Sequence, residues 1–97
     1  MGGIFKYDKM SAFQTKTINK LKAKGWRVIK LIRLSESGFP DLIALKNGVS
    51  IFVECKEKSD TLKPLQAYRI EELKKLGFDA FVEHDGKQSE LDKYLGL

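Results

Sequence analysis

Three charged residues near the middle of the chain have the types and spacing of a site that handles phosphate. Asp41 and Glu54 lie on either side of an Asn47-Gly48 pair, and Lys56 follows two residues after Glu54. Asn-Gly is the strongest short signal for a two-residue β-hairpin turn, because both central residues of a type I′ turn need positive φ. Two carboxylates and one ammonium on such a hairpin predict a divalent-metal site with a cation directed at a phosphate.

The turn also fixes which residues of the hairpin face each other. With Lys46 opposite Val49, the couples further along the ladder are Leu45 with Ser50, Ile43 with Phe52, and Asp41 with Glu54. Residues directly opposite on one face have Cβ atoms about 4.5–5.5 Å apart, and like charges there destabilise the pair. Lys56 points to the same face as Glu54. A cation between the two carboxylates would remove the repulsion, whereas a structural salt-bridge cluster would leave an unbalanced buried charge, which is costly.

The ligand chemistry of this face favours a hard cation. The carboxylate oxygens of Asp41 and Glu54 suit Mg²⁺ or Mn²⁺. The Cys55 side chain points to the opposite face, so we expect its thiol in the core and only its carbonyl near the metal. His84 is the only histidine, and a lone turn histidine is more often solvated than catalytic. A second Glu-x-Lys, residues 72–74, falls on a predicted helix, where residues two apart do not face each other.

Local signals place these residues on a mixed α/β fold. The predicted elements are a helix over about residues 11–24, strands over 26–34, 41–46 and 49–56, a helix over 64–76, a strand over 78–82 and a short helix from Ser89. A capping box at Ser11 and Gln14 opens the first helix, and Gly25 ends it. Residues 26–34 are apolar on both faces, which predicts a central or doubly covered strand. The order α-β-β-β-α-β-α, with a strand-helix-strand crossover after the hairpin, predicts a single domain over residues 1–97 in which helices flank a mixed sheet.

The amino-acid composition excludes some classes of protein and leaves others open. The chain is 42% hydrophobic and 32% charged, as in ordinary globular proteins, and no apolar run is long enough to span a membrane. The single cysteine and the lack of an apolar leader predict a reducing, cytoplasmic setting. The net charge of +5 is uneven, because residues 1–33 carry nine Lys and Arg against Asp8 alone, beginning with a basic lead over residues 1–9. A basic region beside an acidic pocket fits a polyanion held against a metal, although a solvated Lys-rich helix face would give the same count.

Three segments together resemble the core of the PD-(D/E)XK nucleases, and most closely a stand-alone virus-type replication-repair nuclease (VRR-NUC) domain. They are Gly38-Phe39-Pro40-Asp41, Glu54-Cys55-Lys56 and Lys63-Pro64-Leu65-Gln66. The resemblance implies a restriction-endonuclease-like fold and a Mg²⁺-dependent endonuclease. It implies that Asp41, Glu54 and the Cys55 carbonyl bind the metal. It further implies that Lys56 orients or helps to deprotonate the attacking water, and that Gln66 supports the site.

The resemblance also bears on substrate, partner and metal number. Small members of the family are similar to Holliday-junction resolvases and act as homodimers, which implies branched DNA as substrate, a second copy as partner and a phage or prophage origin. The family commonly has an acidic residue on the first helix, a few positions before its Gln. None of the residues 10–13, which precede Gln14, is acidic. This departure favours a one-metal mechanism, or a second metal held mainly by the substrate phosphate.

The nuclease hypothesis predicts DNA contacts that follow the backbone and are independent of sequence. The residues expected to make them are Lys16, Lys20, Ser37, Gly38, Lys58 and Lys63. Two other hypotheses remain: a non-catalytic DNA-binding module on the same fold, which the missing first-helix acid favours, and an interaction protein with a basic surface. Only the nuclease needs Asp41 opposite Glu54 with Lys56 beside them.

Overall fold

The computed structural model describes residues 11–97, so the basic lead over residues 1–9 and Met10 lie outside the described part. Its elements are α1 (Ala12–Ala23), β1 (Arg27–Lys30), β2 (Leu42–Lys46), β3 (Val49–Lys56), α2 (Pro64–Lys75), β4 (Asp79–His84) and α3 (Glu90–Leu95). The predicted order α-β-β-β-α-β-α is confirmed. Within residues 11–97, no helix is both long and apolar enough to cross a membrane.

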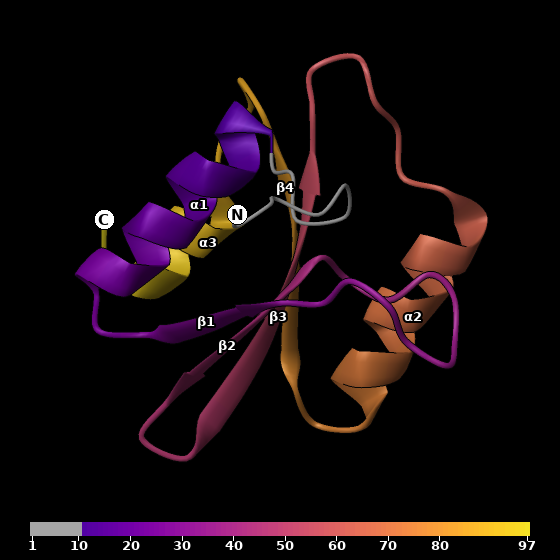
Figure 1. Cartoon of the computed structure of the whole chain (residues 1–97), viewed down its shortest axis with the longest axis horizontal. Coiled ribbons are helices and arrows are strands. Elements are labelled where there is room, and N and C mark those ends of the chain that lie inside the picture. Colours follow the sequence, from indigo (N-terminus) through magenta and orange to yellow (C-terminus); the bar gives the residue numbers. More distant parts are fainter. Residues whose placement is uncertain (1–10) are drawn as a thin grey trace, which may run out of the picture.

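The four strands form one mixed sheet in the order β1-β2-β3-β4. β1, β2 and β3 are antiparallel neighbours, whereas β3 and β4 are parallel and α2 makes the crossover between them. Figure 1 shows α1 and α3 together on one side of the sheet and α2 on the other. The predicted mixed sheet flanked by helices is therefore confirmed.

The β2–β3 hairpin has the predicted turn and register. Asn47 and Gly48 have φ angles of 49° and 79°, as a type I′ turn requires. Lys46 pairs with Val49, and the ladder continues to Leu42 opposite Val53. Asp41 and Glu54 are the next couple in this register, so the turn determines that these two acids face each other.

Apolar side chains form one cluster on each face of the sheet. The α1/α3 side is filled by Ile18, Leu21, Leu42, Ala44, Ile51, Val53 and Leu91, and the α2 side by Phe52, Ile70, Leu73 and Ala80. β3 contributes to both clusters, since alternate residues of a strand point to opposite faces. It is therefore held by packing on both faces, and it is the strand that carries Glu54 and Lys56.

The prediction for residues 26–34 was wrong in extent and in position. β1 ends at Lys30 and lies at the sheet edge, not in its centre. The Leu31 N–H still donates to the Asp41 carbonyl at 2.7 Å, but the chain then leaves the sheet, and Ile32 and Leu34 are 38% and 48% exposed. The apolar pattern of residues 31–34 gives no sign of this, because the contacts that hold the loop after them are made with α2, far along the sequence.

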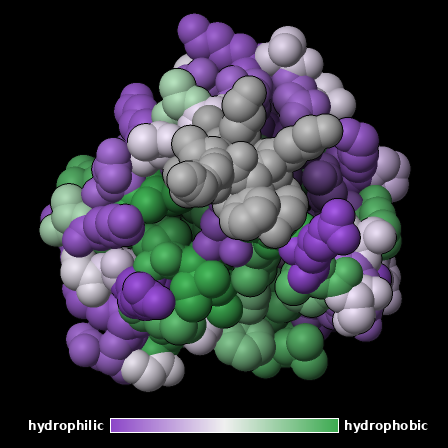
Figure 2. All heavy atoms as spheres, in the orientation of Figure 1, coloured by the Kyte–Doolittle hydropathy of each residue, from purple (hydrophilic) through white to green (hydrophobic). Residues whose placement is uncertain are grey.

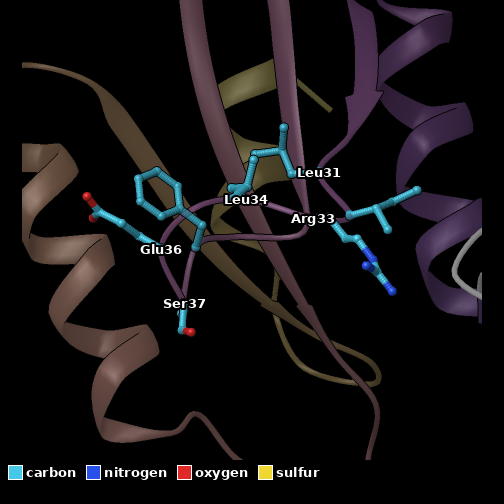
Figure 3. Close-up of a pocket in the computed structure, with 8 residues that line it drawn as sticks. Leu31, Arg33, Leu34, Glu36 and Ser37 are labelled. Carbon is cyan, nitrogen blue, oxygen red and sulfur yellow. The ribbon is translucent and has the colours of Figure 1, made fainter.

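Those contacts hold the loop that leads into Asp41. The Arg69 side chain of α2 donates to the Ser37 carbonyl at 3.0 Å and pairs with Glu36 at 3.4 Å. Figure 3 shows this loop curving around a cavity, with Glu36 directed toward α2. The cavity measures about 460 Å³ and is lined by residues 31–34 and 36–39. Gly38 has a φ of +83°, and a Cβ there would lie 2.6 Å from Leu65 Cγ of α2.

Gly38→Ala should therefore destabilise the fold more than Gly48→Ala. Both glycines have positive φ, which costs a side-chain-bearing residue about 1–2 kcal/mol. Only Gly38 also meets a neighbour, whereas nothing lies within 4 Å of a Cβ at Gly48. We expect an additional loss of about 1–3 kcal/mol for Gly38→Ala, measured as the free energy of unfolding in urea. Equal losses in the two variants would contradict the close approach of the loop to α2.

Candidate functional site

Asp41 and Glu54 meet at the end of the hairpin that is remote from its turn. They line a cavity of about 270 Å³ together with Ser11, Gln14, Cys55, Lys56, Glu57, Asp60 and Gln66. Asp41 Oδ2 accepts a hydrogen bond from the Cys55 N–H at 2.9 Å, which ties the start of β2 to β3 and fixes the carboxylate. The structure thus brings together the residues predicted for the catalytic and metal roles, which are Asp41, Glu54, Cys55, Lys56 and Gln66.

Glu54 has one oxygen satisfied and one without a partner. The residue is only 3% exposed. Oε2 lies 3.3 Å from Lys56 Nζ and 3.3 Å from Gln66 Nε2, whereas Oε1 is buried with no hydrogen-bond partner. Burial, followed by the charge of Asp41, raises the pKa of Glu54 to about 7, against the lowering effect of Lys56. One ammonium is therefore too little positive charge to keep this carboxylate ionised as an ordinary glutamate would be.

Gln66 is held so that its amide nitrogen faces the acid. It is the third residue of α2, and its Oε1 accepts a hydrogen bond from the Lys63 N–H at 3.0 Å. With the oxygen engaged, the Nε2 group is the part of the amide that faces Glu54. Pro64 begins the helix directly after Lys63, as predicted, so the helix start positions a donor at the acid.

The arrangement fits a hard divalent cation by the chemistry of its donors. Glu54 Oε1 is a buried carboxylate oxygen without a partner, on a residue that lines the cavity. Mg²⁺ characteristically takes one or two protein carboxylates and completes its shell with water and phosphate oxygens. Residues 11–97 hold no group of three or more His, Cys, Asp or Glu side chains placed to bind a metal. Among residues 11–97, the ligands would therefore be Asp41, Glu54 and backbone oxygen such as that of Cys55.

The Cys55 thiol is part of the core, as predicted. It packs against the cluster between the sheet and α1/α3, and burial raises its pKa to about 12. A thiol with that pKa stays protonated near neutral pH, and a protonated thiol is a poor metal ligand.

Two acidic residues of the cavity were not predicted from the sequence. Glu57 and Asp60 come from the connection between β3 and α2, and Asp60 Oδ2 lies 3.7 Å from Lys56 Nζ. The i,i+4 spacing of Lys56 and Asp60 was visible in the sequence, but this connection carries no periodic pattern. Only the turn itself brings the two side chains together.

The predicted DNA-contacting residues are distributed over several surfaces. Lys16, Lys58 and Lys63 are exposed. Lys20 instead pairs with Asp92 at 2.6 Å and with Glu83 at 3.8 Å. Ser37 and Gly38 line the loop cavity and not the carboxylate cavity (Figure 3).

Comparisons with known proteins agree with this geometry. A family model described as the VRR-NUC domain matches residues 5–84. A solved structure described as a VRR_NUC domain is 35% identical, with a TM-score of 0.64, over 72% of this chain and 77% of that chain. The Holliday junction resolvase Hjc of Archaeoglobus fulgidus is 17% identical, with a TM-score of 0.60, over 80% of this chain and 70% of that chain. No curated protein matches. The second likeness confirms the predicted restriction-endonuclease-like fold.

The raised pKa of Glu54 predicts an unusual pH dependence of stability. A carboxyl group whose pKa rises from 4.5 to about 7 on folding binds its proton more tightly in the folded chain. Its contribution to the free energy of unfolding therefore falls by about 3 kcal/mol as pH rises from about 4.5 to about 7. Above pH 7 the contribution stays constant. Glu54→Gln should lack this fall. Urea unfolding at pH 5 and pH 8 without divalent ions checks it.

The exposed Glu71 provides the matched control, because Glu71→Gln removes a solvated carboxylate that pairs with Lys74 at 3.5 Å. This variant should keep the pH dependence of the parent. An identical pH profile in parent and Glu54→Gln would show that Glu54 titrates as an ordinary glutamate.

Proposed function

The chain belongs to the VRR-NUC domain family, and on that premise we propose that it is a divalent-metal-dependent endonuclease that hydrolyses phosphodiester bonds in branched DNA, such as four-way junctions. The observation that carries the proposal is the buried Glu54, which faces Asp41 and keeps one oxygen without a partner. A protein that buries such a group for structure alone loses stability. A divalent cation supplied with the substrate offsets that cost.

Asp41 and Glu54 are the residues that hold the cation, with the Cys55 carbonyl as a further oxygen. Mg²⁺ is the expected ion and Mn²⁺ the expected substitute, because both prefer oxygen donors. When bound, the cation polarises the scissile phosphate and lowers the pKa of water. The hydrogen bond from the Cys55 N–H to Asp41 keeps that carboxylate in place before the ion arrives.

Lys56 and Gln66 act on the same cavity from two sides. Lys56 is 3% exposed and pairs with Glu54, so its ammonium provides a fixed point charge for the phosphate and the attacking water. Gln66 donates to Glu54 Oε2 and so leaves the other oxygen of Glu54 for the cation. Because Lys56 and Glu54 are desolvated, their electrostatic effect on a phosphate and a cation is stronger than it would be in water.

We propose branched DNA as the substrate because of the family and because of the resolvase-like fold. A homodimer, which would place two cavities on two strands, stays a prediction. Apolar side chains are available for such an interface: Ile29, Ile32 and Leu34 are each 38% or more exposed. Figure 2 shows apolar side chains gathered on the lower half of the viewed face, with polar ones around them.

Alanine at Asp41, Glu54 or Lys56 should abolish or greatly reduce Mg²⁺-dependent nicking of a four-way junction. Removal of the fixed charge of Lys56 should cost about 10²–10³-fold in rate. Binding of junction DNA, followed by a gel-shift assay in Ca²⁺ or without divalent ions, should persist. The matched control is Lys74→Ala, because Lys74 belongs to the second Glu-x-Lys segment and pairs on the surface of α2.

Full activity in Glu54→Ala would refute the proposed mechanism. DNA binding by the parent chain that is indifferent to Mg²⁺, without cleavage of any substrate in any divalent ion, would instead favour the non-catalytic DNA-binding module.

The exposed lysines should contribute to DNA affinity by neutralising phosphates. Replacing Lys16, Lys58 and Lys63 by alanine should weaken binding to four-way and duplex DNA alike. It should also reduce the slope of log affinity against log salt by about 0.9 for each phosphate that the variant no longer neutralises. Lys20→Ala is the comparison, since its ammonium is engaged by Asp92 and Glu83. A larger reduction of the slope in Lys20→Ala than in the triple variant would show that Lys20, and not these three lysines, makes the main phosphate contacts.

A further inference from the structure

Lys56 is a buried cation with two carboxylate neighbours. Its side chain is 4% exposed, and it lies 3.3 Å from Glu54 Oε2 and 3.7 Å from Asp60 Oδ2. The two acids differ in exposure, because the Glu54 side chain is 4% exposed and that of Asp60 is 48% exposed. The ammonium is thus shared between an acid at the floor of the cavity and an acid at its mouth.

The Asp60 carboxylate is oriented by its own turn. The Asp60 N–H donates to the Glu57 carbonyl at 3.0 Å, which closes a turn directly after β3. Asp60 Oδ1 accepts a hydrogen bond from the Thr61 N–H at 3.1 Å. With Oδ1 engaged by the backbone, Oδ2 is the oxygen that faces Lys56.

The segment that carries this turn is held at both ends. The Lys56 carbonyl accepts a hydrogen bond from the Asp85 N–H at 2.9 Å. Lys58 packs beside Gly86, where a Cβ would lie 3.4 Å from its Cε. One end of the segment is therefore fixed by the β4–α3 turn, and the other by the start of α2 at Lys63.

We propose that Asp60 is a positioning residue for Lys56 in the proposed nuclease reaction, holding the ammonium toward the cavity mouth, where a phosphate would arrive. The proposal rests on the proposed function. When a divalent cation occupies Asp41 and Glu54, the charge of Glu54 is largely neutralised and attracts Lys56 less. Asp60 then remains the partner that keeps the Lys56 side chain in one rotamer. Without Asp60, the ammonium loses one of its two fixed neighbours.

Asp60→Asn tests this role with little effect on the fold. The amide oxygen can still accept from the Thr61 N–H, so the turn is kept, whereas the charge that faces Lys56 is removed. We expect kcat on a four-way junction at saturating Mg²⁺ to fall by about tenfold to a hundredfold, as a misplaced catalytic group does. KM for the junction, the Mg²⁺ concentration for half-maximal rate and the urea midpoint should stay at parent values. Asp60→Glu, which restores the charge, should recover most of kcat.

Glu71→Gln is the control, because Glu71 is an exposed acid of α2 that pairs with Lys74 at 3.5 Å and lies outside the cavity. Its kcat should stay close to that of the parent. A parent-like kcat in Asp60→Asn would overturn the proposal. So would a deficit that added Mg²⁺ restores, since Asp60 would then act on the cation. If the parent chain cleaves no DNA, both the proposed function and the role of Asp60 are wrong. If the parent and Asp60→Asn cleave DNA equally well, only the role of Asp60 is wrong.

Discussion

A shortage of positive charge around one buried carboxylate is the constraint on which the rest of the site depends. Glu54 of β3 lies opposite Asp41, which directly precedes β2, and among residues 11–97 Lys56 is the cation that pairs with Glu54. Desolvation penalises a charge that is not fully compensated. The sheet must therefore hold the two acids together against their electrostatic repulsion. β3 can do this because apolar side chains pack on both of its faces.

A second buried acid shows that burial alone does not mark the site. Glu83 is as buried as Glu54, at 3% exposure each, and lies opposite Cys55 on the adjacent parallel strand. Its carboxylate accepts hydrogen bonds from the Ser89 hydroxyl and the Leu91 N–H, and pairs with Lys20. The protein provides partners for both oxygens of Glu83 and uses them to attach α3 to the sheet. Glu54 differs in its unpartnered oxygen, which is the feature that points to a ligand.

Sequence predicted those features that depend on neighbouring residues. The turn at Asn47 and Gly48, the first residue of α2 and the cap at Ser11 all follow from the conformational preferences of a few residues, and each is present. The turn also carried the prediction further, because one fixed pair determines every other pair in a ladder. The juxtaposition of Asp41 and Glu54 therefore follows from the turn residues alone.

Features that depend on distant contacts were not predictable in this way. The chain leaves the sheet after Lys30 although the apolar run that follows resembles a strand by every local measure. The loop beyond this run is held by Arg69, which is far along the sequence. Asp60 reaches Lys56 only because an irregular turn folds back. Gly38 has a positive φ and lies close to Leu65, which gives it a structural role that no local pattern predicts.

The way in which Gln66 is attached links the stability of a helix end to the state of the site. Helix ends fray readily, and in most proteins the opening of one turn has no effect beyond that turn. Here the same amide group closes the first turn of α2 and restrains Glu54. Any event that unwinds this turn also removes the Gln66 restraint and leaves Lys56 as the partner of Glu54. A cation that orders Glu54 would in turn make the unwinding less favourable. Occupancy of the proposed site would therefore influence how often the first turn of α2 opens, through the two hydrogen bonds of Gln66.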